Sequence, residues 1–142
     1  MILYLDTSAL AKQYIREPES PQVVAWVAAA DLVGASLIAR PEMAAVLGRL
    51  RHMRALDEAA ARSTLDAFYD RWPAYVRLPL NEATANRAGE LAWEHGLRGY
   101  DAVHLATAIL WQVGLGDPVT FATYDRRLGD AARKVGLVVV PA

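Results

Sequence analysis

Short apolar runs alternate with longer segments of helical character along this chain, and that alternation limits the fold more than any other feature. Five runs are short enough to be buried strands: Met1–Leu5, Leu32–Ile38, Tyr75–Leu80, Val119–Ala122 and Leu137–Val140. Strands that alternate with helices form βα units, which build a mainly parallel sheet with helices on both faces. With right-handed crossovers, the pattern predicts an α/β fold, a three-layer sandwich around a mainly parallel five-stranded sheet.

The segments between these runs carry helix start and stop signals. We predict helices over Thr7–Arg16, Pro21–Ala30, Pro41–Ala55, a segment after Asp57, Glu82–His95, Gly99–Gly114 and Thr123–Gly136. Ser20, Asp57 and Asn81 are placed to cap three of them, and Gly96 is placed to end one. The stretch from Pro41 to Trp72 predicts a helical hairpin inserted between strands. A length of 142 residues favours one domain over residues 1–142.

Composition excludes several classes of protein. Hydrophobic residues make up 54% and charged residues 22%, as in ordinary globular proteins. The absence of cysteine excludes a disulfide framework, a thiolate zinc site and a cysteine nucleophile. The longest charge-free apolar stretch, Ala102–Gly116, is too short to span a bilayer, and Asp6 interrupts any signal-peptide core. We therefore expect a soluble, cytoplasmic protein with no membrane partner.

Four carboxylates are predicted at helix N-termini, where sites form in open α/β sheets. They are Asp6, Glu42, Asp101 and Asp125. Each one alone is explained by capping or by the helix dipole, worth roughly 0.3–1 kcal/mol. Gathered at one end of a sheet, however, two such charges about 4 Å apart repel by roughly 4 kcal/mol at an effective dielectric of 20. Such a cluster needs raised pKa values or a divalent cation, and an all-oxygen ligand set favours Mg²⁺ or Mn²⁺.

Hard cations beside carboxylates are a recurrent arrangement for hydrolysing phosphodiesters, with one metal or with two. Three local strings carry a resemblance to a family with that chemistry. Asp6-Thr7-Ser8-Ala9-Leu10-Ala11-Lys12, followed by Glu17-Pro18, resembles the opening of PIN-domain ribonucleases, in particular the VapC-type toxins of bacterial toxin–antitoxin pairs. Tyr100–Ala106 resembles their third acidic motif and Phe121–Leu128 their fourth, while Glu42 matches the acid at the head of the third helix.

The resemblance covers nearly the whole chain and implies a magnesium-dependent endoribonuclease whose sheet has the flavodoxin-like order 3-2-1-4-5. By position, Asp6 and Asp101 would be the principal metal ligands. Glu42 and Asp125 would complete the acidic pocket and activate or orient water. The remaining implied site residues are hydroxyls that hold the carboxylates: Thr7, Ser8 and Thr123.

The resemblance also implies partners. The substrate would be RNA, and a VapB-type antitoxin would place its C-terminal segment in a groove near the first helices. Toxins of this type commonly form homodimers. Apolar helix edges at Leu10–Tyr14 and Val23–Val27 are compatible with such contacts.

Arginine is the dominant basic residue, since Lys12 and Lys134 are the only lysines among 15 basic residues. Guanidinium groups near the acids could bind RNA phosphates, and the candidates are Arg49, Arg98 and Arg126. A solvated helix face is the alternative for Arg49 and its neighbours Arg51 and Arg54.

Histidines and aromatic residues have structural explanations at this level. His104 lies three residues after Asp101, but we expect it to pack against the sheet rather than to bind metal. His52, His95 and Tyr124 are expected on the surface, although Tyr124 could also narrow the pocket mouth or stack on a base. Core or interface packing is expected, in preference to base stacking, for four tryptophans: Trp26, Trp72, Trp93 and Trp111.

Three alternatives stay open. A receiver-like signalling module shares the fold class and an acidic Mg²⁺ pocket, but the third strand is followed by Asn81-Glu82 and the last by Pro141-Ala142, so its phosphoacceptor Asp and Lys are missing. A dehalogenase-type phosphatase needs Asp-x-Asp, whereas the string here is Asp6-Thr7-Ser8. A PIN-like RNA-binding module without catalysis is the third alternative.

Overall fold

The computed structural model describes residues 1–142, and its centre is one five-stranded sheet. The strands are β1 (Ile2–Leu5), β2 (Leu32–Ser36), β3 (Val76–Leu78), β4 (Val119–Ala122) and β5 (Val138–Val140). Their order is β3-β2-β1-β4-β5, and all four pairings are parallel. The predicted fold class and strand order are therefore confirmed.

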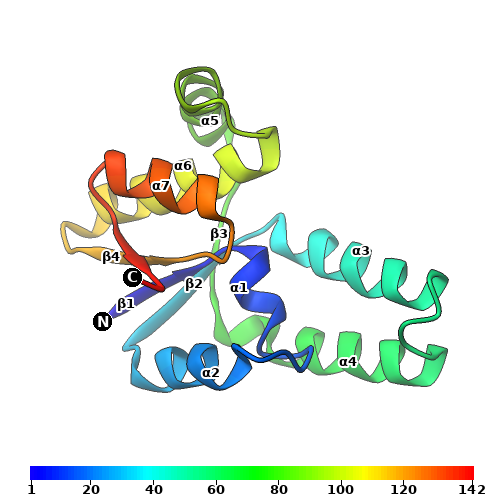
Figure 1. Ribbon diagram of the computed structural model, residues 1–142. Helices are drawn as coiled ribbons and strands as arrows, with labels where there is room; N and C mark the ends of the chain where they lie inside the picture. The colour runs from blue at the N-terminus through cyan, green and yellow to red at the C-terminus, as the bar shows by residue number, and fades with distance from the viewer.

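Seven helices connect the strands. They are α1 (Thr7–Ala11), α2 (Ser20–Ala29), α3 (Ala39–His52), α4 (Glu58–Arg71), α5 (Glu82–His95), α6 (Gly99–Leu115) and α7 (Arg126–Lys134), and a 3₁₀ turn (Trp72–Ala74) follows α4. Asp57 and Asn81 cap α4 and α5 as predicted, and Gly96 ends α5 with a φ of 63°. The expected hairpin is α3 and α4, which run side by side and project from the sheet (Figure 1).

The helices cover both faces of the sheet (Figure 1). Along β1, Tyr4 packs with α5, α6 and α7, while Leu3 and Leu5 pack with α1–α4 on the opposite face. This division follows from the period-2 alternation of side chains along a strand. Because β1 is central, every one of its apolar side chains is fully buried from Leu3 onward.

Gly34 on β2 is required by a close approach. A Cβ atom at this position would lie 2.6 Å from Trp111 of α6. The absence of a side chain therefore lets the indole of Trp111 pack directly on the sheet.

Four predicted helices start or end elsewhere in the structure. The helix predicted over Pro41–Ala55 spans Ala39–His52. The first helix ends at Ala11 rather than Arg16, because Lys12 to Tyr14 turn more tightly and bond to carbonyls three residues back. Ser20 does not cap α2, since its hydroxyl bonds to Glu17 and Ile15 instead. The last helix begins at Arg126, not Thr123. No helix is long and apolar enough to cross a membrane.

Candidate active site

The topology brings the predicted acids to one end of the sheet. β1 lies between β2 and β4, so the chain leaves β1 and β4 toward opposite sides, and a crevice opens where their carboxyl ends meet. Asp6 follows β1, Glu42 lies in the first turn of α3 after β2, and Asp125 follows β4 as the cap of α7. Asp101 reaches the same place from the first turn of α6.

Asp6 is the buried floor of this site, with only 4% of its surface exposed. Its Oδ1 accepts from the hydroxyl of Ser8 at 2.6 Å and from the backbone N–H of Ala9 at 2.9 Å. Its Oδ2 accepts from the hydroxyl of Thr123 at 2.6 Å. Burial raises the pKa of Asp6, although His104 and these hydrogen bonds act in the opposite direction.

Thr123 joins two of the acids. Its hydroxyl donates to Asp6 and accepts from the backbone N–H of Asp125 at 3.0 Å. Asp125 in turn caps α7 by accepting from the N–H of Leu128 at 2.9 Å. The loop after β4 is therefore fixed to the end of β1 by side chains rather than by strand pairing alone.

Glu42 has a different environment, with hydrogen bonds from two other elements. Its Oε1 accepts from the hydroxyl of Thr7 at 2.7 Å and lies 2.7 Å from His104 Nε2. Burial would raise the pKa of Glu42, but the hydrogen bonds from His104 and Thr7 outweigh it and lower the pKa. Glu42 is therefore an ionised carboxylate at neutral pH.

Arg98 supplies the nearest positive charge. Its Nε donates to Asp101 Oδ2 at 2.9 Å, and its Nη2 lies 3.6 Å from Asp125 Oδ2. The guanidinium thus bridges two carboxylates that would otherwise repel each other, while its side chain remains 80% exposed. Sequence reasoning gave this compensating role to a divalent cation.

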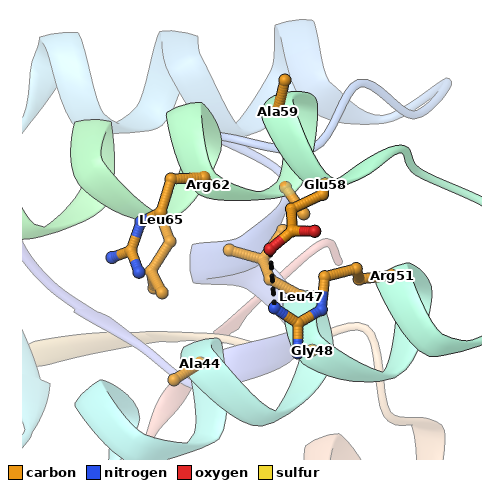
Figure 2. A pocket seen from close by; sticks show the side chains of 9 residues that line it. Ala44, Leu47, Gly48, Arg51, Glu58, Ala59, Arg62 and Leu65 are labelled. Carbon is orange, nitrogen blue, oxygen red and sulfur yellow. Dashed lines mark ion pairs between the residues drawn. The ribbon is translucent and has the colours of Figure 1, made fainter.

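All four carboxylates line one pocket of about 890 Å³. A separate hollow of about 570 Å³ lies between α3 and α4, with an apolar floor and an ion pair of 3.6 Å between Arg51 and Glu58 (Figure 2). That second hollow is lined by one acid, Glu58, whereas the first is lined by all four predicted carboxylates.

The four carboxylates of the acidic pocket offer oxygen ligands, which hard cations such as Mg²⁺ prefer. No group of three or more acidic or histidine side chains is arranged closely enough to hold an ion as the side chains stand. Asp101 and Asp125 are turned toward Arg98, and these contacts account for part of the separation between the carboxylates. The residues fit a metal chemically, and Arg98 contacts Asp101, one of the two predicted ligands.

The arginines that sequence reasoning grouped together separate in the structure. Arg49 lines the acidic pocket beside Arg98. Arg51 points to the other side of α3, toward Glu58 (Figure 2). Arg126 lines a third hollow with His95 and Lys134, away from the four acids.

The aromatic residues and His95 agree with the expectations only in part. Tyr124 lies at the edge of the acidic pocket, stacks on Trp26 with a ring separation of 6.2 Å, and carries Lys12 above its ring. Lys12 is itself buried and paired with Glu17 and Glu19. Trp72 and Trp111 are core residues, as predicted. Trp93 is 93% exposed on the outer face of α5, so it is not a core residue, and interface packing stays a prediction for it. His95, expected on the surface, has a buried Nε2.

His104 is the residue whose position in the site sequence reasoning missed. It does pack against the sheet, with 2% of its surface exposed, yet its Nε2 reaches Glu42. Its spacing of three residues from Asp101, on the same helical face, was the signal that could have placed it at the pocket.

The fold and the acidic pocket are those expected of PIN-domain ribonucleases, and comparison of the sequence with known families gives the same class. The model of the PIN-domain family matches residues 3–134, so the chain belongs to that family. Ribonuclease VapC45 of Mycobacterium tuberculosis (strain CDC 1551 / Oshkosh) is 34% identical over 142 residues, covering 99% of this chain and 96% of that protein. The chain is thus a VapC-type PIN ribonuclease, a phosphodiester hydrolase of the kind that forms the toxin of a toxin–antitoxin pair.

Solved structures share the fold at lower identity. The crystal structure of FitAcB from Neisseria gonorrhoeae has a TM-score of 0.73 and 22% identity, covering 97% of this chain and 96% of that one. A toxin–antitoxin complex from Klebsiella pneumoniae has a TM-score of 0.62 and 21% identity, covering 88% and 87%. Family membership removes the receiver-like and dehalogenase-type alternatives.

Proposed function

We propose that this ribonuclease cleaves RNA by metal-dependent hydrolysis in the acidic pocket at the carboxyl ends of β1 and β4. The observation that carries the proposal is the convergence of Asp6, Glu42, Asp101 and Asp125 on one pocket. Nucleases of this family are typically metal-dependent. Mg²⁺ or Mn²⁺ is the cofactor that an all-oxygen donor set favours.

Each acid has a role that follows from its surroundings. Asp6 and Asp101 would hold the metal, which when bound lowers the pKa of a water and neutralises phosphate oxygens. Asp6 is fixed in place by Ser8 and Thr123, so its carboxylate needs no rearrangement to accept a cation. Glu42 is ionised and accepts a hydrogen bond from the attacking water, which orients it toward phosphorus. Asp125 would supply the fourth carboxylate of the acidic pocket.

RNA phosphates would be bound by the arginines at the pocket. Arg98 is exposed and within reach of two acids, so it can turn from them to a phosphate oxygen. Arg49 lines the pocket from α3 and offers a second contact. Arg126 remains a candidate only for a phosphate farther along the strand, since it lies in a separate hollow.

A VapB-type antitoxin is the protein partner we propose, and solved toxin–antitoxin complexes with this fold support it. Its C-terminal segment would lie near α1 and α2, where Val24 is 52% exposed. A homodimer is the second assembly we propose. Light scattering of the purified chain, alone and with its antitoxin, measures both.

The test is cleavage of end-labelled total tRNA by the purified protein with Mn²⁺, Mg²⁺ or EDTA. Wild type should give discrete cuts that need metal, and Asp101→Asn should give none. The control is Asp66→Asn, an exposed acid on α4 far from the pocket, which should cut like wild type. If wild type cleaves neither tRNA nor ribosomal RNA with either metal, the non-catalytic RNA-binding alternative replaces this proposal. Cleavage that persists in EDTA would contradict the metal site.

A further inference from the structure

A chain of hydrogen bonds runs from the core of the sheet into the acidic pocket. Tyr4 of β1 is fully buried, and its hydroxyl lies 2.7 Å from His104 Nδ1. On the other side of the imidazole, His104 Nε2 lies 2.7 Å from Glu42 Oε1 and 3.2 Å from the hydroxyl of Thr7. Four elements, β1, α1, α3 and α6, are joined through one side chain.

The direction of each hydrogen bond in this chain follows from its two ends. Glu42 is an ionised carboxylate and can only accept, so His104 Nε2 carries the proton. Tyr4 is a fully buried phenol, which has one O–H to donate. That O–H points at Nδ1, which therefore accepts. These hydrogen-bond directions assign the proton to Nε2 and the acceptor role to Nδ1.

We propose that His104 is a positioning residue for RNA cleavage: anchored by Tyr4, its Nε2–H fixes the Glu42 carboxylate in the orientation that receives the attacking water. This inference rests on the proposed function of the pocket. Glu42 lies in the first turn of a helix that projects from the sheet, and its carboxylate is partly exposed. With Oε1 held by His104 and Thr7, Oε2 is the oxygen left free for water.

The variants separate orientation from packing. His104→Leu removes the hydrogen bonds of His104 to Tyr4 and Glu42. His104→Gln keeps an N–H donor toward Glu42, and Tyr4→Phe removes only the phenolic O–H. Leu105→Val is the matched control, because Leu105 is a fully buried neighbour on α6 whose side chain has no polar atom to take part in the hydrogen bonds. Melting temperatures of all four establish that each variant is folded under the assay conditions.

We expect His104→Leu to lower kcat about tenfold to a hundredfold, the range seen when a partner that orients a site residue is removed. KM for RNA should stay within about twofold, since the lost contact acts on the water and not on RNA binding. His104→Gln should recover most of the rate, and Tyr4→Phe should fall between His104→Leu and wild type. Leu105→Val should cleave like wild type.

A second measurement is independent of activity. The ¹⁵N chemical shifts of the His104 ring in wild type should show a protonated Nε2 and an unprotonated Nδ1, and Tyr4→Phe should mix the two forms. Wild-type kcat in His104→Leu, a His104→Gln rate no better than His104→Leu, or an Nδ1–H ring would each overturn the inference. If wild type and Leu105→Val both fail to cleave, the proposed function fails instead, which is a distinguishable result.

Discussion

At the scale of single residues, the site is defined by how each carboxylate is compensated. Asp6 is buried and receives three neutral hydrogen bonds, Glu42 is held by His104 and Thr7, and Asp101 and Asp125 share Arg98. Like charges gathered in one pocket must be stabilised in some such way. These differences give each acid its own expected response to mutation.

Asp6→Asn should stabilise the metal-free protein. Because burial raises the pKa of Asp6 above its usual 3.8, the native state binds more protons than the unfolded state, and stability falls as pH rises through that interval. Asn removes this cost: its amide oxygen can still accept from the Ala9 N–H, and its NH₂ group can donate to the Thr123 hydroxyl, which in wild type donates to Asp6. We expect the melting temperature at pH 7 to rise by about 2 °C or more, and the decline above pH 4 to flatten. Calorimetry without metal measures both, and a lower melting temperature at pH 7 would contradict the argument.

Arg98→Gln should strengthen metal binding and weaken RNA binding. The guanidinium forms ion pairs with two carboxylates at the pocket. An exposed ion pair is worth about 0.2–1 kcal/mol, so its loss should lower the Kd for Mn²⁺ by up to about fivefold. The KM for RNA should rise because a phosphate contact is lost. Titration calorimetry with Mn²⁺ measures the first effect. Arg87→Gln, which breaks an ion pair on α5, should change neither value.

At the scale of elements, the sheet and the helices on it depend on a few close contacts. β2 approaches α6 at Gly34, where Trp111 fills the space that a side chain would need. At the outer end of the α3–α4 hairpin, Arg51 and Glu58 form an ion pair (Figure 2). Its inner end carries Glu42 to the pocket, so the same helix serves packing and the site.

Gly34→Ala should destabilise the protein by about 1–3 kcal/mol, because a methyl group there meets the rigid indole of Trp111 at 2.6 Å. Gly89→Ala is the matched control, since nothing lies within 4 Å of that position on α5. Alanine in a helix interior is more favourable than glycine, so the control should gain about 0.5–1 kcal/mol. Urea denaturation gives both values, and equal effects at the two positions would show that Trp111 moves aside.

At the scale of the whole molecule, the acidic pocket joins segments from both ends of the chain. β1 and β4 are paired, and Thr123 is bonded to Asp6 across 117 residues of sequence. A ligand bound there connects α1, α3, α6 and the loop before α7. Because such a ligand binds only the folded chain, it stabilises the whole molecule rather than one segment.

Millimolar Mn²⁺ or Mg²⁺ should therefore raise the melting temperature, by an amount equivalent to about 2.7 kcal/mol when the concentration is a hundred times Kd. Removal with EDTA should reverse the shift, and Asp101→Asn should reduce it. Differential scanning fluorimetry against a Ca²⁺ and a Na⁺ series separates specific binding from ionic strength. A melting temperature that is independent of Mn²⁺ would contradict a shared site.

The sequence by itself determined the strands, the helices, the strand order through family resemblance, and the four acids near helix starts. The strands and helices follow from signals that act within a few residues: apolar runs, capping side chains and terminating glycines. Helix ends were less well predicted, because Lys12 and Ser20 form hydrogen bonds with partners that local patterns do not specify. Only the tertiary structure decided that His104 holds Glu42 across 62 residues, that Arg98 bridges two acids, and that Arg51 and Arg126 lie away from them. The physical reason is that side-chain contacts between distant segments depend on how helices pack on the sheet, and periodicity along the chain does not specify that packing.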